Sequence, residues 1–160
     1  MLELGKSGSH GTERGTVPVL SGDAVVATLR ASNWKEAATA QVGDRSWVYS
    51  RQGGRELVAR WAIDPADAVR LRARQESYWK GNWTVELDGT TVEVVTASKW
   101  KGTRRYLAGG RQLAESGTTG AWSSRPTLTA QPELALDHAV FLLWVELVLG
   151  RRSAANAAAV

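Results

Sequence analysis

The chain of 160 residues has no cysteine, a single phenylalanine, a single methionine and two histidines. Without cysteine it forms no disulfide, carries no thiolate nucleophile and offers no Cys-ligated zinc site. Two histidines far apart in the sequence do not indicate a zinc site either. The N-terminal residues contain no apolar run of the signal-peptide type. Together these absences are typical of a reducing compartment, so we expect a cytoplasmic protein.

Catalytic patterns are also missing. His138 follows Asp137, but no nucleophile is placed beside them by the sequence, so we expect a hydrogen-bonded histidine rather than a triad. His10 is expected in an exposed loop. Asp64 and Asp67 lie in the segment DPAD, where they are expected to cap a turn. The sequence thus predicts a protein that is not an enzyme and has no cofactor and no metal, although an active site need not show in a single sequence, so an enzyme of unknown class stays an alternative.

Phosphate-binding glycine motifs are absent as well. The glycine pairs at 53–54 and 109–110 have neither the phosphate-loop nor the dinucleotide-binding spacing. We interpret both pairs as hairpin turns.

The longest apolar segment is 134–150, LALDHAVFLLWVELVLG, which only Asp137, His138 and Glu146 interrupt. A surface helix has one polar face, and this segment has none, so a bilayer or the protein must surround it. About 17 residues with three polar groups are short and costly for a bilayer span. We therefore predict a buried helix over 132–150, with Pro132 or Glu133 in its first turn and Gly150 just after its end. The side chains expected to be almost fully buried are Phe141, Leu142, Trp144, Val145 and Val148.

Short β-rich runs fill the rest of the chain from Thr16 onwards. Turn signals recur every eight to twelve residues, which predicts eleven or twelve antiparallel strands in a sandwich or barrel. Alternation is clearest in 69–75 and in 83–87. Asp88-Gly89 predicts a hairpin that turns Glu86 and Glu93 to solvent and Val92 and Val94 to the core.

The domain boundaries follow from these patterns. Residues 1–15 are expected to form a flexible arm, in which Leu2 and Leu4 form at most one short strand. Residues 16–152 are predicted to be a single β-barrel domain that includes the helix. The final segment 153–160, SAANAAAV, is expected to be disordered.

Over residues 16–152 this layout resembles the tubby C-terminal-like superfamily, which includes LURP-one-related proteins, phospholipid scramblases and small bacterial homologues. The segments that carry the resemblance are LALDHAVFLLWVELVLGRR, RSWVYSR and SYWKGNWTVELDG. It implies a mainly β fold, a closed antiparallel barrel of about twelve strands around a buried hydrophobic C-terminal helix. Such a barrel is too wide for its own side chains to fill, and an all-round apolar helix suits its interior.

Glu146 is the one carboxylate expected inside such a barrel. It must be neutral, paired with an arginine, or located at the end of the barrel. A structural ion pair is the simpler interpretation. A polar anchor for a ligand inside the barrel is the alternative.

Two segments combine cations with aromatic residues, and each contains the triplet WKG, at 79–81 and 100–102. Two such turns can mark equivalent corners of a barrel. Cations beside Trp suit anionic headgroups at a membrane surface or a nucleic-acid strand, and equally suit turns whose Trp packs over the barrel end. If the resemblance carries phospholipid binding with it, the candidate residues are Lys80, Lys99, Lys101, Arg104, Arg105, Trp79 and Trp100.

The formal net charge is +4, and 15 of the 20 cationic residues are arginine, a composition that suggests a bacterial source. A modest positive charge permits acidic partners without requiring one. We therefore expect a non-enzymatic barrel, peripheral to the membrane, that binds anionic phospholipid. The alternatives are a lipocalin-type barrel for a small hydrophobic ligand and, less favoured, nucleic-acid binding with steep salt dependence.

Overall fold

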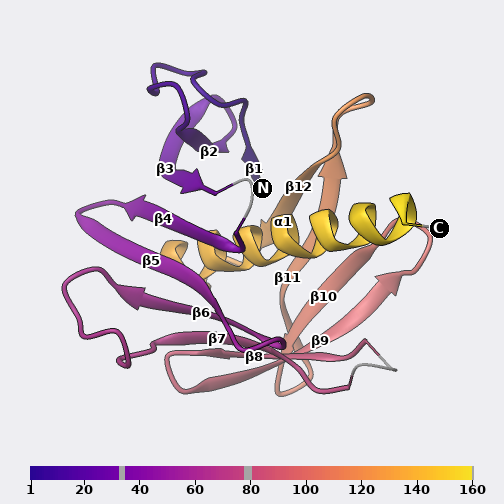
Figure 1. The fold of residues 1–160 in the computed structure, drawn as a ribbon. Helices are drawn as coiled ribbons and strands as arrows, with labels where there is room; N and C mark the ends of the chain where they lie inside the picture. Colours follow the sequence, from indigo (N-terminus) through magenta and orange to yellow (C-terminus); the bar gives the residue numbers. More distant parts are fainter. Residues whose placement is uncertain (33–34, 78–80, 160) are drawn as a thin grey trace.

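A computed structural model, which describes residues 1–32, 35–77 and 81–159, shows a closed antiparallel barrel of twelve strands with one helix (Figure 1). The strands follow one another around the barrel in chain order, and β1 closes it by pairing with β12, with Leu2 opposite Leu128. The predicted fold class is therefore confirmed. The strands are β1 (Leu2–Leu4), β2 (Val17–Ser21), β3 (Ala24–Ala31), β4 (Ala37–Val42), β5 (Arg45–Gln52), β6 (Glu56–Trp61), β7 (Leu71–Gln75), β8 (Trp83–Leu87), β9 (Thr90–Ser98), β10 (Thr103–Ala108), β11 (Arg111–Thr119) and β12 (Arg125–Ala130).

The hairpin between β8 and β9 forms where the sequence predicts it. Asp88 and Gly89 have φ values of 52° and 90°, the left-handed backbone that a tight two-residue hairpin turn needs at both positions. In this register Glu86 and Glu93 are exposed, whereas Val92 is buried and Val94 is half-buried. The alternation predicted for these strands is confirmed.

The helix α1 (Leu136–Ala158) runs through the barrel and fills it. The five side chains predicted to be buried are at most 2% exposed. The ring of Tyr49 on β5 lies 5.5 Å from that of Phe141 and 5.0 Å from that of Trp144, measured between centroids. These contacts explain the all-round apolar sequence, because the strands surround the helix on every side.

The predicted limits of the helix are wrong at both ends. Pro132 and Glu133 lie in a turn before α1, which begins at Leu136. Gly150 lies inside α1 and does not end it, since the helix continues to Ala158. The alanine-rich segment after Gly150 has high helix propensity. Arg152 also fixes it to the barrel, because its Nε donates to Glu36 at 2.8 Å. The disorder expected for 153–160 is thus replaced by helix over 153–158.

The arm predicted over 1–15 also begins inside the barrel. Leu2–Leu4 forms β1, which pairs with β2 on one side and β12 on the other. The loop that follows is held by local hydrogen bonds, with Gly5 N donating to Pro18 O at 2.8 Å and Gly8 N to Thr16 O at 2.9 Å. The boundary at residue 16 is therefore wrong, because the strand that closes the barrel precedes it.

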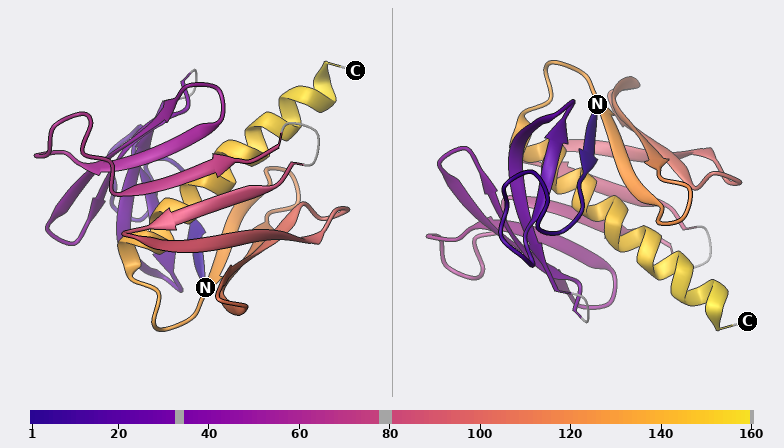
Figure 2. Two further views of the ribbon diagram at one scale, coloured as in Figure 1. Left: turned by 90° about the horizontal axis from the view of Figure 1, so that it is seen from below. Right: turned by 90° about the horizontal axis from the view of Figure 1, so that it is seen from above.

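Consecutive antiparallel strands place their connections alternately at the two ends of the barrel. We call the end where α1 begins the proximal mouth; it holds the connections at 22–23, 43–44, 62–70, 88–89, 109–110 and 131–135. The distal mouth, from which the last turns of α1 project (Figure 2), holds the described residues of the connections at 5–16, 32–36, 53–55, 76–82, 99–102 and 120–124. In the part of the chain that the structure describes, α1 lacks the long uninterrupted apolar sequence that a membrane-crossing helix needs.

Candidate functional site

Charge is divided unequally between the two mouths. All six aspartates of the chain lie in proximal connections or in the first turn of α1: Asp23, Asp44, Asp64, Asp67, Asp88 and Asp137. The described lysines all lie in distal connections and are exposed: Lys6, Lys35, Lys99 and Lys101. The separation follows from the sequence, because Asp favours the tight turns at 22–23, 43–44 and 88–89. Glu13, Glu36 and Glu76 also lie in distal connections, but among the described residues the cations there outnumber them. The distal end is therefore the more basic one, which attracts anions, and the proximal end is acidic.

Two tryptophans at the distal mouth are fully exposed. Trp100 in the β9–β10 turn is 96% exposed, and Trp122 in the β11–β12 loop is 102% exposed. Lys99 and Lys101 flank Trp100 directly in the sequence. An indole gains by leaving water and keeps one N–H that wants a polar partner, which suits it to a boundary between water and an apolar phase.

The two WKG triplets belong to connections at the same mouth. Their last residues, Gly81 and Gly102, both have a φ of 64°, the left-handed backbone that favours glycine. Most turn glycines of the chain share this conformation, so the equivalence of the two corners stays a prediction. Trp79 and Lys80 lie outside the described residues.

A buried polar cluster lies below the distal mouth, where β10 meets α1. Glu146 of α1 is 6% exposed. Arg104 Nη1 donates to Glu146 Oε2 at 2.7 Å, and the hydroxyl of Tyr106 donates to Glu146 Oε1. Burial raises the pKa of the Tyr106 hydroxyl and the neighbouring carboxylate raises it further, so the phenol keeps its proton and serves as a donor. The structural ion pair expected for Glu146 is confirmed.

An open groove of about 450 Å³ lies above this cluster. One wall is α1, with Leu147, Gly150 and Ala154, and the facing wall is formed by β11 and β12 with their loop. Its volume is in the range of small-molecule sites. Lys101, Arg104 and Arg151 all line it, so the groove is positively charged at its rim.

The structure separates the predicted site residues. Lys99, Trp100 and Lys101 lie together on one distal turn, and Arg104 lines the groove. Arg105 points to the other face of β10, where its Nε lies 3.3 Å from Glu115 Oε2. Trp122 and Arg151 were not predicted. A tryptophan in the turn segment GAWSSRP is a signal that could have identified Trp122, because turns rarely need a large apolar side chain.

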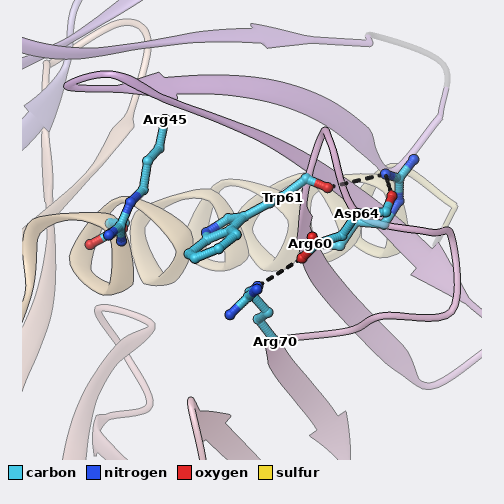
Figure 3. A network of polar contacts seen from close by, with 6 residues as sticks. Arg45, Arg60, Trp61, Asp64 and Arg70 are labelled. Atoms are coloured by element: carbon cyan, nitrogen blue, oxygen red, sulfur yellow. Dashed lines mark hydrogen bonds and ion pairs between the residues drawn. The ribbon is translucent and has the colours of Figure 1, made fainter.

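The proximal mouth carries a network of paired charges (Figure 3). Arg45 Nη1 lies 3.2 Å from Asp137 Oδ2, and Arg70 Nε lies 2.9 Å from Asp64 Oδ2. The guanidinium carbons of Arg45 and Arg70 lie 4.9 Å and 3.3 Å from the ring centroid of Trp61. Arginines at this mouth are thus engaged with carboxylates and with an indole face.

The turn predicted at DPAD is present, with Ala68 N donating to Pro65 O at 3.0 Å. The role expected for Asp64 is wrong, because its carboxylate binds Arg70 and does not cap the turn. Arg60 fixes the same loop by donating from Nη1 to the carbonyl oxygens of Trp61 at 3.2 Å and Asp64 at 3.0 Å. These bonds hold the loop 62–70 in place at the proximal mouth.

Across 1–32, 35–77 and 81–159, no three His, Asp or Glu side chains come close enough together to hold a metal ion. Comparison of the chain with family models, with curated proteins and with solved structures finds no match. The tubby-like relationship is therefore a prediction that rests on the barrel and its central helix.

Proposed function

We propose that the protein binds anionic phospholipid at a membrane surface through its distal mouth. The observation that carries the proposal is the coincidence, at one end of the barrel, of exposed lysines with two fully exposed tryptophans, Trp100 and Trp122. The aspartates lie at the opposite end. The same function is implied by the resemblance to the tubby-like superfamily.

The physical argument has two parts. Each Lys or Arg near an anionic lipid surface contributes about 1 kcal/mol of attraction, and Trp rings favour the interfacial region. The acidic proximal mouth is repelled by the same surface, so the charge separation orients the barrel with its distal mouth toward the lipid. Neither Trp100 nor Trp122 has to move out of the core to reach the bilayer, since both are already exposed.

The alternative of a lipocalin-type barrel is less well supported. A ligand held inside the barrel would need the space that α1 occupies, where Tyr49, Phe141 and Trp144 are in ring contact. Removing the helix would expose its ten buried side chains, including Glu146. A surface mode of binding requires no such change.

Vesicle flotation tests the proposal. Wild-type protein is expected to float with phosphatidylserine-containing vesicles, to stay behind with phosphatidylcholine vesicles, and to lose binding as salt rises. The double variant Lys99→Gln/Lys101→Gln should bind about 30-fold more weakly, at about 1 kcal/mol per lysine. The matched control is Arg105→Gln/Arg111→Gln, which removes the same charge from the outer wall and the proximal mouth.

Unchanged flotation of the lysine variant, or equal losses in both double variants, would overturn the proposal. Equal losses would mean that net charge, and not the distal mouth, determines binding. Binding to a single-stranded oligonucleotide with a steep salt dependence, and none to vesicles, would support the nucleic-acid alternative instead.

A further inference from the structure

The groove at the distal mouth combines an apolar wall with a cationic rim. On α1, Leu147, Gly150 and Ala154 follow one another at helical spacing and face Gly117 of β11 and Pro126 of β12. These side chains are small or apolar and offer no charged group along the length of the groove. Among the described residues that line it, the charged ones are Lys101, Arg104, Arg151 and Glu146.

These four charges do not cancel. Glu146 is already neutralised by Arg104 and receives a hydrogen bond from Tyr106. Arg151 donates to the backbone carbonyl of Ser32 at 3.2 Å, a neutral partner. No carboxylate in the described part of the chain pairs with Lys101 or Arg151. The rim therefore keeps two positive charges that an anionic group can neutralise.

Gly150 leaves the groove unobstructed but lowers the stability of the helix. A glycine inside a helix destabilises it by about 1 kcal/mol relative to alanine. A Cβ at position 150 would meet nothing within 4 Å, and its backbone is not in the left-handed region. Neither packing nor backbone conformation therefore requires glycine at this position. Any larger side chain there would project into the groove.

We propose that this groove binds the hydrocarbon chain of a single-chain anionic amphiphile, of the fatty-acid or monoalkyl-phosphate class. The chain lies along Leu147, Gly150 and Ala154, and the anionic head contacts Lys101 and Arg151. The inference rests on the proposed function in one respect, that this mouth faces lipid, which is the source of such a molecule. Apolar burial supplies most of the affinity and the two cations select for a negative head.

Calorimetric titration with dodecyl phosphate, below its micellar concentration, tests the inference. Two partial probes are titrated in the same way. Inorganic phosphate represents the anionic head without a hydrocarbon chain, and dodecyl maltoside represents the hydrocarbon chain with an uncharged head. Wild-type protein should bind one dodecyl phosphate, and should bind each of the two partial probes at least tenfold more weakly.

The variant Gly150→Leu tests the groove itself. It should bind dodecyl phosphate at least tenfold more weakly than wild-type protein does, while its melting temperature stays equal or rises. The matched control, Ala155→Leu, places the same side chain on an exposed position of α1 that does not line the groove and should bind as wild type does.

Three results would overturn the inference: no binding of dodecyl phosphate, equal affinity for inorganic phosphate or for dodecyl maltoside, or undiminished binding by Gly150→Leu. Vesicle flotation separates this outcome from failure of the proposed function. If wild-type protein floats with anionic vesicles but does not bind dodecyl phosphate, the groove proposal fails and the surface proposal stands. If dodecyl phosphate binding is lost in Gly150→Leu while wild-type protein does not float, the groove proposal stands and the surface proposal fails.

Discussion

The guanidinium of Arg104 on β10 donates to the carboxylate of Glu146 on α1 across 2.7 Å. The carboxylate side chain is 5% exposed and the guanidinium side chain 22% exposed, so this pair joins the wall of the barrel to the helix inside it. The hydroxyl of Tyr106 donates to the second carboxylate oxygen. With both oxygens engaged, a charge can remain within an apolar helix.

Removing the guanidinium alone should be costly. Arg104→Ala leaves the buried Glu146 carboxylate without its counterion, so we expect the free energy of unfolding to fall by about 3 kcal/mol. The triple variant Arg104→Met/Tyr106→Phe/Glu146→Leu removes every polar member of the cluster and should recover most of that loss. Urea denaturation of both proteins measures the difference. If the triple variant were as unstable as Arg104→Ala, the loss would not come from the unpaired carboxylate. The polar cluster would then stabilise the barrel more than apolar side chains of similar size do.

Two buried tyrosine hydroxyls should respond differently to removal. The hydroxyl of Tyr49 has no hydrogen-bond partner among the described residues, whereas that of Tyr106 donates to Glu146. Tyr49→Phe is expected to leave stability unchanged or to raise it by up to about 1 kcal/mol, and Tyr106→Phe to lower it by about 1–3 kcal/mol. The same denaturation experiment compares the two variants. Equal losses in both would contradict the assignment of hydrogen bonds.

Stability should fall at high pH because of the same two side chains. Burial raises the pKa of Tyr49, with a further contribution from Asp137, and burial and Glu146 raise the pKa of Tyr106. Below pH 10 the folded and unfolded chains both keep these protons. Above it the unfolded chain releases them and the folded chain does not, which lowers the unfolding free energy by about 1.4 kcal/mol per pH unit for each tyrosine.

Absorbance at 295 nm checks this, since phenolate formation by Tyr49 and Tyr106 should coincide with unfolding. Tyr49→Phe removes one of these two phenols. The part of the fall in unfolding free energy above pH 10 that Tyr49 and Tyr106 cause should therefore be about half as steep in this variant. Ionisation of both residues in the folded barrel, well before unfolding, would contradict their burial.

The continuation of α1 past Gly150 predicts a stabilising substitution. Gly150→Ala adds a methyl group that meets no neighbour within 4 Å and restricts the unfolded chain, so stability should rise by about 1 kcal/mol and the melting temperature by about 2–4 °C. If the helix ended at Gly150, as glycine commonly signals, alanine there would be neutral or destabilising. Thermal unfolding followed by circular dichroism distinguishes the two.

The fold was largely predictable because its signals are local. Apolar residues on every side of 134–150 require a helix that is surrounded, and Asp88-Gly89 requires a tight hairpin. The end of α1 was not predictable by the same means. Gly150 has the sequence signature of a helix end, and the contact of Arg152 with Glu36, 116 residues away in the chain, is tertiary. The helix propensity of the alanine-rich segment and this tertiary contact thus outweigh the local effect of glycine.

The candidate site was predictable only in part. The WKG turn at 100–102 stood out by composition, whereas Arg105 could not be separated from Arg104 until strand β10 showed which face each occupies. The charge separation between the mouths needed only the strand order, because consecutive antiparallel strands turn at alternate ends. Each aspartate-containing turn falls at the same end for this reason. The groove depends on the last turns of α1 and could not be predicted from a helix that ended at 150.

The orientation of the barrel on a membrane is the most direct test of the account. Since the chain has no cysteine, single variants Ser123→Cys, beside Trp122 at the distal mouth, and Ile63→Cys, at the proximal mouth where Ile63 is 90% exposed, can each carry one environment-sensitive fluorophore. On addition of phosphatidylserine-containing vesicles, emission should brighten and shift to the blue for the label at position 123 and stay unchanged for the label at position 63. A shift at position 63 alone, or equal shifts at both, would contradict binding through the distal mouth.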